Sequence, residues 1–106
     1  MDYLLNRYCP KTKFDSYEDL CENFTIQVPE NFNFGYDIVD EWARVEPEKL
    51  ALLWTNDSKE MKSYTFTDVS RISNQAANFF RAHGIRKGDV VMLILKQRPE
   101  VWFSIV

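Results

Sequence analysis

Hydrophobic and polar positions follow no regular period in the first third of the chain. Residues 1–34 mix aromatic and charged side chains, and they predict one short helix over residues 16–24, capped at its N-terminus by Asp15. Residues 28–34 are expected to be extended, because a proline disfavours helical backbone at the residue before it. We therefore interpret residues 1–34 as a wrapping segment that lies over a neighbouring surface and does not fold alone.

The rest of the chain has a regular pattern that changes between helical and strand periods. Apolar residues three and four positions apart predict a helix over residues 36–45, which Pro47 ends. The apolar run 50–55, a polar turn and residues 62–65 predict a β-hairpin. Residues 35–106 are thus expected to be the start of a large α/β domain.

A long amphipathic helix with clear ends is predicted after the hairpin. Thr65 is placed to cap this helix, with Asp68 as the acidic partner in a capping box. Gly84 is the expected left-handed residue beyond its C-terminus. One face of the helix is expected to be buried, and its apolar residues are Phe66, Val69, Ile72, Ala76, Phe79 and Phe80.

The most apolar run of the chain, Val-Val-Met-Leu-Ile-Leu, occupies residues 90–95. Such a run predicts a strand buried on both faces, as in parallel sheets covered by helices. Pro99 then fits the first turn of a final helix, which remains apolar up to Val106. A single strand of this kind has no sheet of its own to join, so we expect the sequence to continue beyond Val106.

The pattern as a whole predicts an α/β fold with helices, a hairpin and one buried strand of a larger sheet. An unpaired strand edge and an apolar last helix are expected to make the chain self-associate. A homodimer that exchanges the terminal helix would cover both surfaces.

Composition narrows the classes of function. The net charge is −3 and the 13 Lys and Arg residues are scattered, which argues against nucleic-acid binding. No apolar run approaches the ~20 residues that span a bilayer, and the N-terminus lacks a signal-peptide pattern. Cys9 and Cys21 have no metal-ligand spacing, so both are expected to be reduced. We therefore predict a cytoplasmic protein without a membrane span.

Several polar groups have both a functional and a structural interpretation. Two acidic sets could in principle bind a metal: Asp15, Glu18, Asp19 and Glu22, and then Asp37, Asp40 and Glu41. Without a rigid loop or a histidine, a solvated helix face explains each set better. His83 has no Ser or Cys placed to use it as a base, and a cation at a helix C-terminus is stabilising in any case.

The remaining candidates are two glycines, two glycosylation-like triplets and two cations. Gly84 and Gly88 lack the density of glycines and hydroxyls that a phosphate loop needs. The triplets that begin at Asn23 and Asn56 carry no meaning without a secretory signal. Lys96 and Arg98 follow the predicted strand, where ligands of α/β sheets gather, although solvation of a strand end explains them better. We predict no catalytic, cofactor-binding or metal-binding residue in this sequence.

Several short blocks follow one another in the second part: Tyr64–Val69, then Asn74, Ala76 and Ala77, then His83–Val91. In this order they resemble the first conserved block of the AMP-forming adenylate-forming superfamily, which includes acyl-CoA synthetases, adenylation domains and luciferases. The N-terminal region of acetyl- and medium-chain acyl-CoA synthetases is similar to three upstream segments: residues 28–34, 37–43 and 50–54. The resemblance covers residues 14–106, and the ordered combination is more specific than any single block.

The resemblance implies a two-step carboxylate–CoA ligase that uses ATP, magnesium and CoA. The family joins a carboxylate to ATP, giving an acyl-adenylate and pyrophosphate, and the CoA thiol then displaces AMP. It uses a Ser/Thr/Gly-rich phosphate loop, an aromatic and acidic motif for adenine and ribose, and a lysine on a mobile C-terminal domain. None of these motifs occurs in this sequence, so no family site residue is carried over. The chain alone is expected to be inactive and to bind no cofactor.

Two other interpretations remain open. A free-standing small α/β module could share the pattern, complete its own sheet and bind a partner protein through its aromatic surface. An aryl-CoA ligase or a peptide-synthetase adenylation domain would keep the superfamily but change the chemistry, and the segments 32–34 and 37–42 argue against it. The acyl-chain preference is not encoded in these residues.

Overall fold

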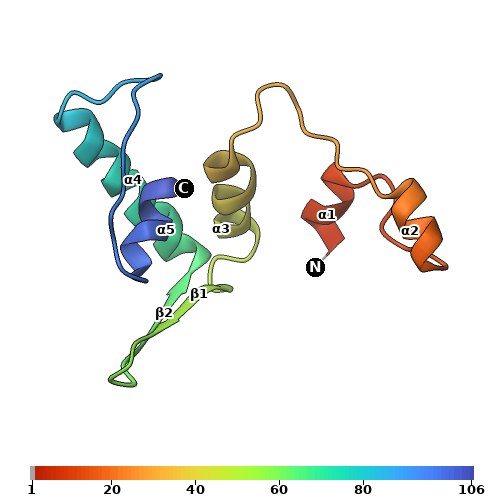
Figure 1. Cartoon of the computed structure of the whole chain (residues 1–106), viewed down its shortest axis with the longest axis horizontal. Coiled ribbons are helices and arrows are strands. Elements are labelled where there is room, and N and C mark those ends of the chain that lie inside the picture. Colours follow the sequence, from red (N-terminus) through yellow and green to blue (C-terminus); the bar gives the residue numbers. More distant parts are fainter. Residues whose placement is uncertain (1) are drawn as a thin grey trace. The chain divides into compact units, whose positions relative to one another are not determined.

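The structure, a computed structural model, describes residues 2–106. They separate into two units, one ending at Phe32 and one running from Asn33 to Val106 (Figure 1). The α/β character is confirmed, since helices accompany a two-stranded antiparallel sheet. The predicted division into a wrapping segment and the start of a larger domain stays a prediction.

The first unit contains two short helices, α1 (Asp2–Tyr8) and α2 (Tyr17–Asn23). The predicted helix is present as α2, whereas the sequence pattern does not predict α1. The side chain of Ser16 caps α2 and accepts a hydrogen bond from the backbone N–H of Asp19 at 3.2 Å. The cap predicted at Asp15 is wrong, because Ser16 stands at the spacing that lets a cap side chain reach that N–H group. Asp15 instead donates its own N–H to the Asp19 carboxylate at 3.0 Å.

After α2 the chain returns to α1. The N–H of Gln27 donates to the C=O of Tyr8 at 2.7 Å, and the Phe32 ring packs edge-on against Tyr8 with centroids 5.6 Å apart. The N–H of Phe32 also donates to the C=O of Pro29 at 3.0 Å, which closes a turn. The extended course predicted for residues 28–34 is therefore wrong at its centre, since the chain turns there and Phe32 packs on Tyr8.

Both cysteines belong to the first unit and both are free thiols, Cys9 buried and Cys21 exposed. No helix within residues 2–106 is long and apolar enough to cross a membrane.

The second unit begins with a helix of two kinds. The π-helix η1 (Gly35–Asp40) passes directly into the α-helix α3 (Glu41–Val45). The side-chain oxygen of Asn33 accepts from the N–H of Tyr36 at 3.1 Å, and the N–H of Asn33 donates to Asp37 at 2.8 Å. These reciprocal bonds fix the start of the helix. The helix predicted in this region is confirmed.

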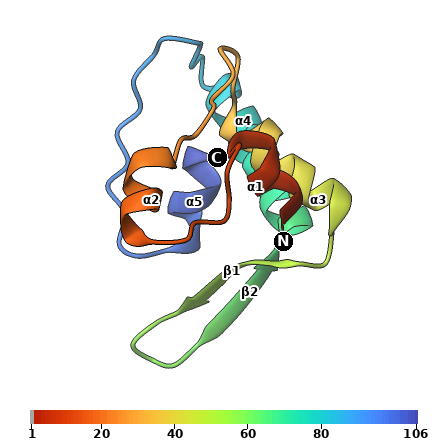
Figure 2. The ribbon, with the colours of Figure 1, turned by 90° about the vertical axis from the view of Figure 1, so that its right-hand side faces the viewer.

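The predicted β-hairpin is confirmed as β1 (Leu50–Thr55) and β2 (Met61–Thr65). The strands pair antiparallel, with Trp54 opposite Lys62, and the turn between them uses a left-handed backbone at Lys59, with φ of 61°. Figures 1 and 2 show the hairpin projecting beyond the helices of its unit. Its strands pair readily because one short turn brings the second strand back to the first.

The helix α4 (Phe66–Ala82) has both of its predicted ends. The N–H of Asp68 donates to the Thr65 hydroxyl at 3.2 Å, and the N–H of Thr65 donates to the Asp68 carboxylate at 3.1 Å, which completes a capping box. Gly84 is left-handed with φ of 87°, and the next N–H donates to the C=O of Phe80 at 3.1 Å. This is a Schellman motif, so local chemistry fixes both ends.

The core of the second unit forms where η1, α4 and the hairpin meet α5 (Pro99–Ile105), the helix predicted after Pro99. Its buried residues are Val39, Val69 and Phe103. Tyr64 meets Phe103 edge-on, with ring centroids 5.1 Å apart. Six partly buried residues pack around this core: Ala51, Leu52, Tyr64, Phe66, Ile72 and Val106.

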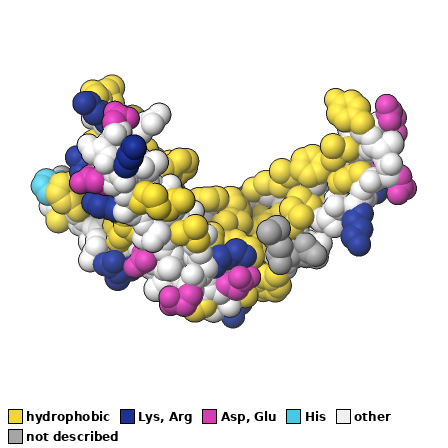
Figure 3. All heavy atoms as spheres, turned by 90° about the horizontal axis from the view of Figure 1, so that it is seen from below, with side chains coloured by type: hydrophobic (Ala, Val, Ile, Leu, Met, Phe, Trp, Pro, Cys, Tyr) yellow, Lys and Arg dark blue, Asp and Glu magenta, His cyan; other side chains and the backbone are white. Residues whose placement is uncertain are grey.

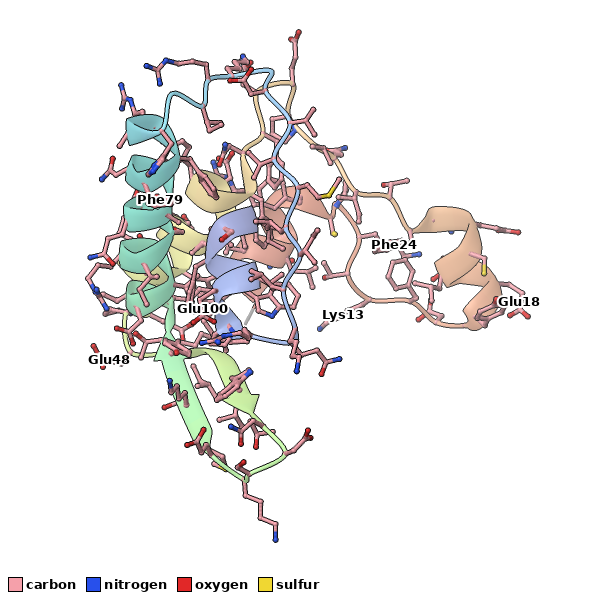
Figure 4. The ribbon with its side chains drawn as sticks, turned by 60° about the vertical axis from the view of Figure 1, so that its left-hand side comes forward. Lys13, Glu18, Phe24, Glu48, Phe79 and Glu100 are labelled. Atoms are coloured by element: carbon pink, nitrogen blue, oxygen red, sulfur yellow. The ribbon has the colours of Figure 1, made fainter. Side chains whose placement is uncertain are left out.

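The buried face predicted for α4 is confirmed in the half of the helix that follows the hairpin and only in part beyond it, where Ala76 and Phe80 are half-buried. Val69 is buried and Ile72 is half-buried, whereas Phe79 is 59% exposed. Figure 4 shows Phe79 toward the end of α4 that lies away from the hairpin. The prediction that Phe79 is buried is therefore wrong for this chain, because the core lies at the other end of the helix.

Residues 90–95 form no strand in this structure, so the predicted buried strand is wrong for this chain. They belong to the long irregular stretch between α4 and α5 (Figure 1). Their exposure alternates, at 81–94% for the even-numbered residues and 37–48% for the odd-numbered ones. A period of two is that of a strand. The segment is extended, but no strand of residues 2–106 pairs with it.

Candidate functional site

Lys96 and Arg98, the two cations that follow the apolar run 90–95, line a hollow beside the hairpin. The hollow has a volume of about 660 Å³. Its lining comes from the hairpin, with Trp54, Asp57, Glu60 and Lys62 among its residues, and from Lys96, Gln97 and Arg98. The structure thus brings two residues that the sequence analysis considered, and interpreted as a solvated strand end, together with side chains of the hairpin.

Trp54 joins the two sides of this hollow. Its indole N–H donates to the backbone C=O of Gln97 at 2.7 Å, although 43 positions separate the two residues in the sequence. Lys62 places its ammonium group 5.7 Å from the centroid of the Trp54 ring. The sequence pattern identifies Trp54 only as a strand residue. Its role could have been suspected because an indole N–H that becomes half-buried needs a hydrogen-bond acceptor.

Arg98 and Glu100 form a bidentate ion pair at the start of α5, with N–O distances of 3.2 and 3.1 Å. The hydrogen bonds with Glu100 raise the pKa of Arg98, and those with Arg98 are the main cause that lowers the pKa of Glu100. Both side chains are more than half exposed, so the pair stabilises the fold little. Figure 4 shows Glu100 in the first turn of α5, close to the hairpin.

The charges around the hollow balance. Three cations and three carboxylates belong to it or border it: Lys62, Lys96, Arg98, Asp57, Glu60 and Glu100. Glu60 is also held by the side-chain amide of Asn56 at 2.6 Å. A neutral set of exposed charges does not concentrate anions. This hollow therefore offers no net positive charge to the phosphate groups of ATP or CoA.

An apolar cavity of about 320 Å³ also lies in the second unit. Its lining residues are Phe34, Ile38, Val39, Trp42, Ala51, Leu52, Phe66, Val69, Trp102 and Val106. A specific ligand pocket combines such apolar walls with a few polar groups that fix the ligand's orientation. Beyond two indoles this lining has no polar side chain, so it has no charged group that could pair with a carboxylate.

The acidic residues considered as metal ligands make local contacts. Asp19 accepts from the Lys11 ammonium at 2.5 Å and from the Asn23 amide at 2.7 Å, and the Lys11 contact is the main cause that lowers the pKa of Asp19. Asp40 accepts from the Ser70 hydroxyl at 2.5 Å. Within residues 2–106, no set of three or more His, Cys, Asp and Glu residues is arranged to hold a metal ion.

His83 makes its contacts within the last turn of α4. Its Nδ1 lies 2.8 Å from the C=O of Phe79, and the two rings have centroids 4.3 Å apart. Gly84 and Gly88 are both left-handed, with φ of 87° and 96°, and shape the turns that follow the helix. These contacts fit a helix end. That the sequence holds no catalytic, cofactor-binding or metal-binding residue stays a prediction.

A family profile described as AMP-binding enzyme matches residues 39–106, which is more than half of the chain. The chain therefore belongs to the AMP-binding enzyme family. This confirms the resemblance to the N-terminal region of AMP-forming acyl-CoA synthetases.

Curated relatives point to the same group. Acyl-coenzyme A synthetase ACSM3, mitochondrial, of Homo sapiens is 33% identical over 105 residues, which are 93% of this chain and 18% of that protein. Acyl-coenzyme A synthetase ACSM5, mitochondrial, of Rattus norvegicus is 39% identical over 85 residues, 74% of this chain and 15% of that protein. The chain thus spans less than a fifth of the length of these relatives.

Proposed function

We propose that the chain is the N-terminal part of an AMP-forming carboxylate–CoA ligase of the acyl-CoA synthetase type. The reaction converts a fatty or shorter carboxylic acid, ATP and CoA into acyl-CoA, AMP and pyrophosphate. The observation that carries this proposal is the family match over residues 39–106, supported by relatives named as acyl-coenzyme A synthetases. Because the chain spans only 18% of the human relative, the proposed activity is that of a longer protein.

In this proposal the chain contributes scaffold rather than chemistry. ATP, magnesium, CoA and the carboxylate would bind groups that this sequence lacks: a Ser/Thr/Gly-rich phosphate loop, a motif for adenine and ribose, and a catalytic lysine. The polar hollow is neutral, and the apolar cavity has no charged group that could pair with a carboxylate. The capped helix α4 and the hairpin instead supply a rigid framework.

A protein that continues the reading frame beyond Val106 tests the proposal. With ATP, magnesium, CoA and acids from acetate to octanoate, it should release pyrophosphate and form the CoA thioester. Failure with every acid would overturn the ligase proposal. A preference for benzoate over all aliphatic acids would instead favour the aryl-CoA ligase.

The 106-residue chain by itself is proposed to be inactive. Isothermal titration with ATP and magnesium should show no saturable binding, and a pyrophosphate-release assay should stay at background. The reason is that the sequence has no phosphate loop and no lysine placed by a C-terminal domain. Stoichiometric, saturable ATP binding would contradict this part of the proposal.

We also propose that the chain self-associates through its exposed apolar surface. Figure 3 shows hydrophobic side chains over much of the face in view, with charged groups between them. Val90, Met92 and Ile94 are each more than 80% exposed, and Trp102 on α5 is 54% exposed. Apolar surface of this extent favours association. A strictly monomeric mass at high micromolar concentration would instead favour the free-standing interaction module.

The location in the cell is a separate proposal. The sequence predicts a cytoplasmic protein, and we retain that location as a proposal, whereas the relatives named above are mitochondrial by their names. A fluorescent fusion to the end of the complete reading frame decides between the two. Co-localisation with a mitochondrial marker would overturn the cytoplasmic location.

A further inference from the structure

The stretch between α4 and α5 touches the rest of the second unit through few polar contacts. We call residues 89–97 the strap. At its first end, the N–H of Arg86 donates to the Asp89 side chain at 2.7 Å, and the N–H of Asp89 donates to the C=O of Arg86 at 3.0 Å. Along residues 90–95, no backbone hydrogen bond links the strap to any other residue in the described chain.

The other end of the strap leads into α5, whose first residue Pro99 is buried, and a side chain from the hairpin also holds it. The Trp54 indole N–H donates to the C=O of Gln97 at 2.7 Å, and no other hydrogen bond joins hairpin and strap within residues 2–106. Around this bond the two segments do not pack closely, because β1, residues 95–98 and two residues of α5, Val101 and Trp102, line a hollow of about 530 Å³. The indole therefore spans a gap between two segments that are otherwise loosely joined.

We propose that Trp54 is a latch. It holds the C-terminal end of the strap against β1, and the strap moves away from the hairpin when this one hydrogen bond breaks. Apolar contacts hold the strap only in part, since its odd-numbered residues 91, 93 and 95 are still 37–48% exposed. Regions with few buried contacts and few backbone hydrogen bonds are the ones that open locally.

The latch has a consequence for the apolar run in the strap. While the latch is closed, residues 90–95 stay extended beside their own unit, with their odd-numbered side chains partly covered. The backbone edges of residues 90–95 are unpaired in both states, and opening additionally uncovers the odd-numbered side chains, so that both rows can pack against another strand. The proposal rests on the geometry of this chain and does not depend on the proposed ligase activity.

Hydrogen exchange of indole N–H groups tests the bond directly in the unmodified chain. In ¹⁵N-labelled protein, Nε1–H of Trp54 should exchange about fivefold more slowly than Nε1–H of Trp102, the factor that a typical net hydrogen bond gives. Trp102 is the internal reference because its side chain is 54% exposed. Equal rates for the two indoles would overturn the latch.

Limited proteolysis with two variants tests the consequence. Trp54→Phe keeps an aromatic ring and removes the N–H donor, so trypsin should cleave after Lys96 about fivefold faster. Trp102→Phe is the matched control, because it makes the same exchange at an indole that is 54% exposed and leaves the Lys96–Gln97 cleavage site unaltered, and its rate should stay unchanged. Cleavage after Arg71, inside α4, reports unfolding of the unit and should change in neither variant.

Two results would contradict the latch. One is an unchanged rate after Lys96 in Trp54→Phe. The other is an equal acceleration after Lys96 and Arg71, because Trp54 would then support the whole unit and not the strap alone. If Trp54→Phe does not fold, the exchange measurement on the unmodified chain still decides the question.

Discussion

In the second unit, residues 50–55 pair with a second strand and residues 90–95 do not, although the latter segment is the more apolar of the two. β1 meets β2 after one short turn, so closing the ladder costs little chain entropy. Residues 90–95 have the alternating exposure of a strand, yet their even-numbered side chains are 81–94% exposed. What separates the two segments is the presence of a partner strand nearby in the chain.

The comparison shows that strand propensity describes a side chain's fit to a pleated, half-buried surface more than an independent tendency of the backbone. For β1 that surface exists, because Leu52 packs on the core and its neighbouring strand places Tyr64 against Phe103. The strap lacks such a surface, because neither of its edges has a partner strand and one of its faces is uncovered. The two segments should therefore respond in opposite ways to mutation, the first in stability and the second in association.

The largest loss of stability is expected for a substitution in the core on which the hairpin packs. Phe103→Ala should lower the free energy of unfolding by about 3–5 kcal/mol, because it leaves a cavity in the core. Phe103 is 6% exposed and packs edge-on against Tyr64. Chemical denaturation followed by circular dichroism measures the loss. Ile105→Ala on the same helix is the control, since Ile105 is 58% exposed. Equal losses at both positions would show that α5 faces the core differently.

A smaller effect is expected at the junction between the hairpin and α4. Thr65→Ala removes the hydroxyl that accepts from the N–H of Asp68 and should cost about 0.5–2 kcal/mol of stability. Thr65→Ser keeps the hydroxyl and should retain most of the stability that the cap contributes. Thermal unfolding of both variants measures the difference. If the Ala and Ser variants unfold alike, the capping box does not contribute in solution.

The same cap should make stability depend on pH. Hydrogen bonds from the backbone N–H and the hydroxyl of Thr65 lower the pKa of Asp68, with a smaller contribution from Arg71. Because the folded-state pKa lies below the unfolded one, this contribution is present above about pH 4 and is lost as the pH falls through the folded value. Asp68→Asn should therefore lose less stability than the unmodified chain between pH values of about 5 and 3. Parallel pH profiles for the two proteins would argue against this role.

Local chemistry made several elements predictable from the sequence. The cap at Thr65, the left-handed Gly84 and the hairpin each depend on residues a few positions apart, and all three are confirmed. The cap placed at Asp15 in place of Ser16 is a local error of one position, whereas the errors at Phe79 and at residues 90–95 arise where distant residues decide. Phe79 is exposed because the core forms at the other end of α4, and residues 90–95 stay unpaired because the chain supplies no adjacent strand.

In the candidate site, too, the local features could be predicted from the sequence and the contacts between distant residues could not. Lys96 and Arg98 could be placed at the end of an apolar run from the sequence alone. Their neighbours could not, because Asp57, Glu60 and Trp54 come from the hairpin. The Trp54–Gln97 hydrogen bond joins residues 43 positions apart, so no local sequence pattern predicts it. The charge balance that makes the hollow unsuited to phosphate is likewise visible only in three dimensions.

Phe79→Ala should have almost no effect on stability, within about 0.5 kcal/mol, as is usual for exposed positions. The side chain is 59% exposed, whereas the neighbouring Phe80 is half-buried and should cost more when truncated to Ala. Denaturation of both variants at low concentration measures this order. A cost of about 3–5 kcal/mol for Phe79→Ala would instead mean that the ring is fully buried in solution, for example by a second copy of the chain.

The smallest change in stability, close to zero, is expected for Ile94→Lys, and this variant should have the clearest effect on association. Ile94 is 85% exposed in a segment with no strand partner, so a lysine there disturbs no packing. A charge on an open strand edge opposes pairing with another chain. Light scattering across a dilution series should therefore show a lower mass than for the unmodified chain. Ile94→Val keeps the apolar edge and should associate as before. If Ile94→Lys associates as strongly as Ile94→Val, the contact between copies lies elsewhere, and α5 with its exposed Trp102 becomes the surface to test.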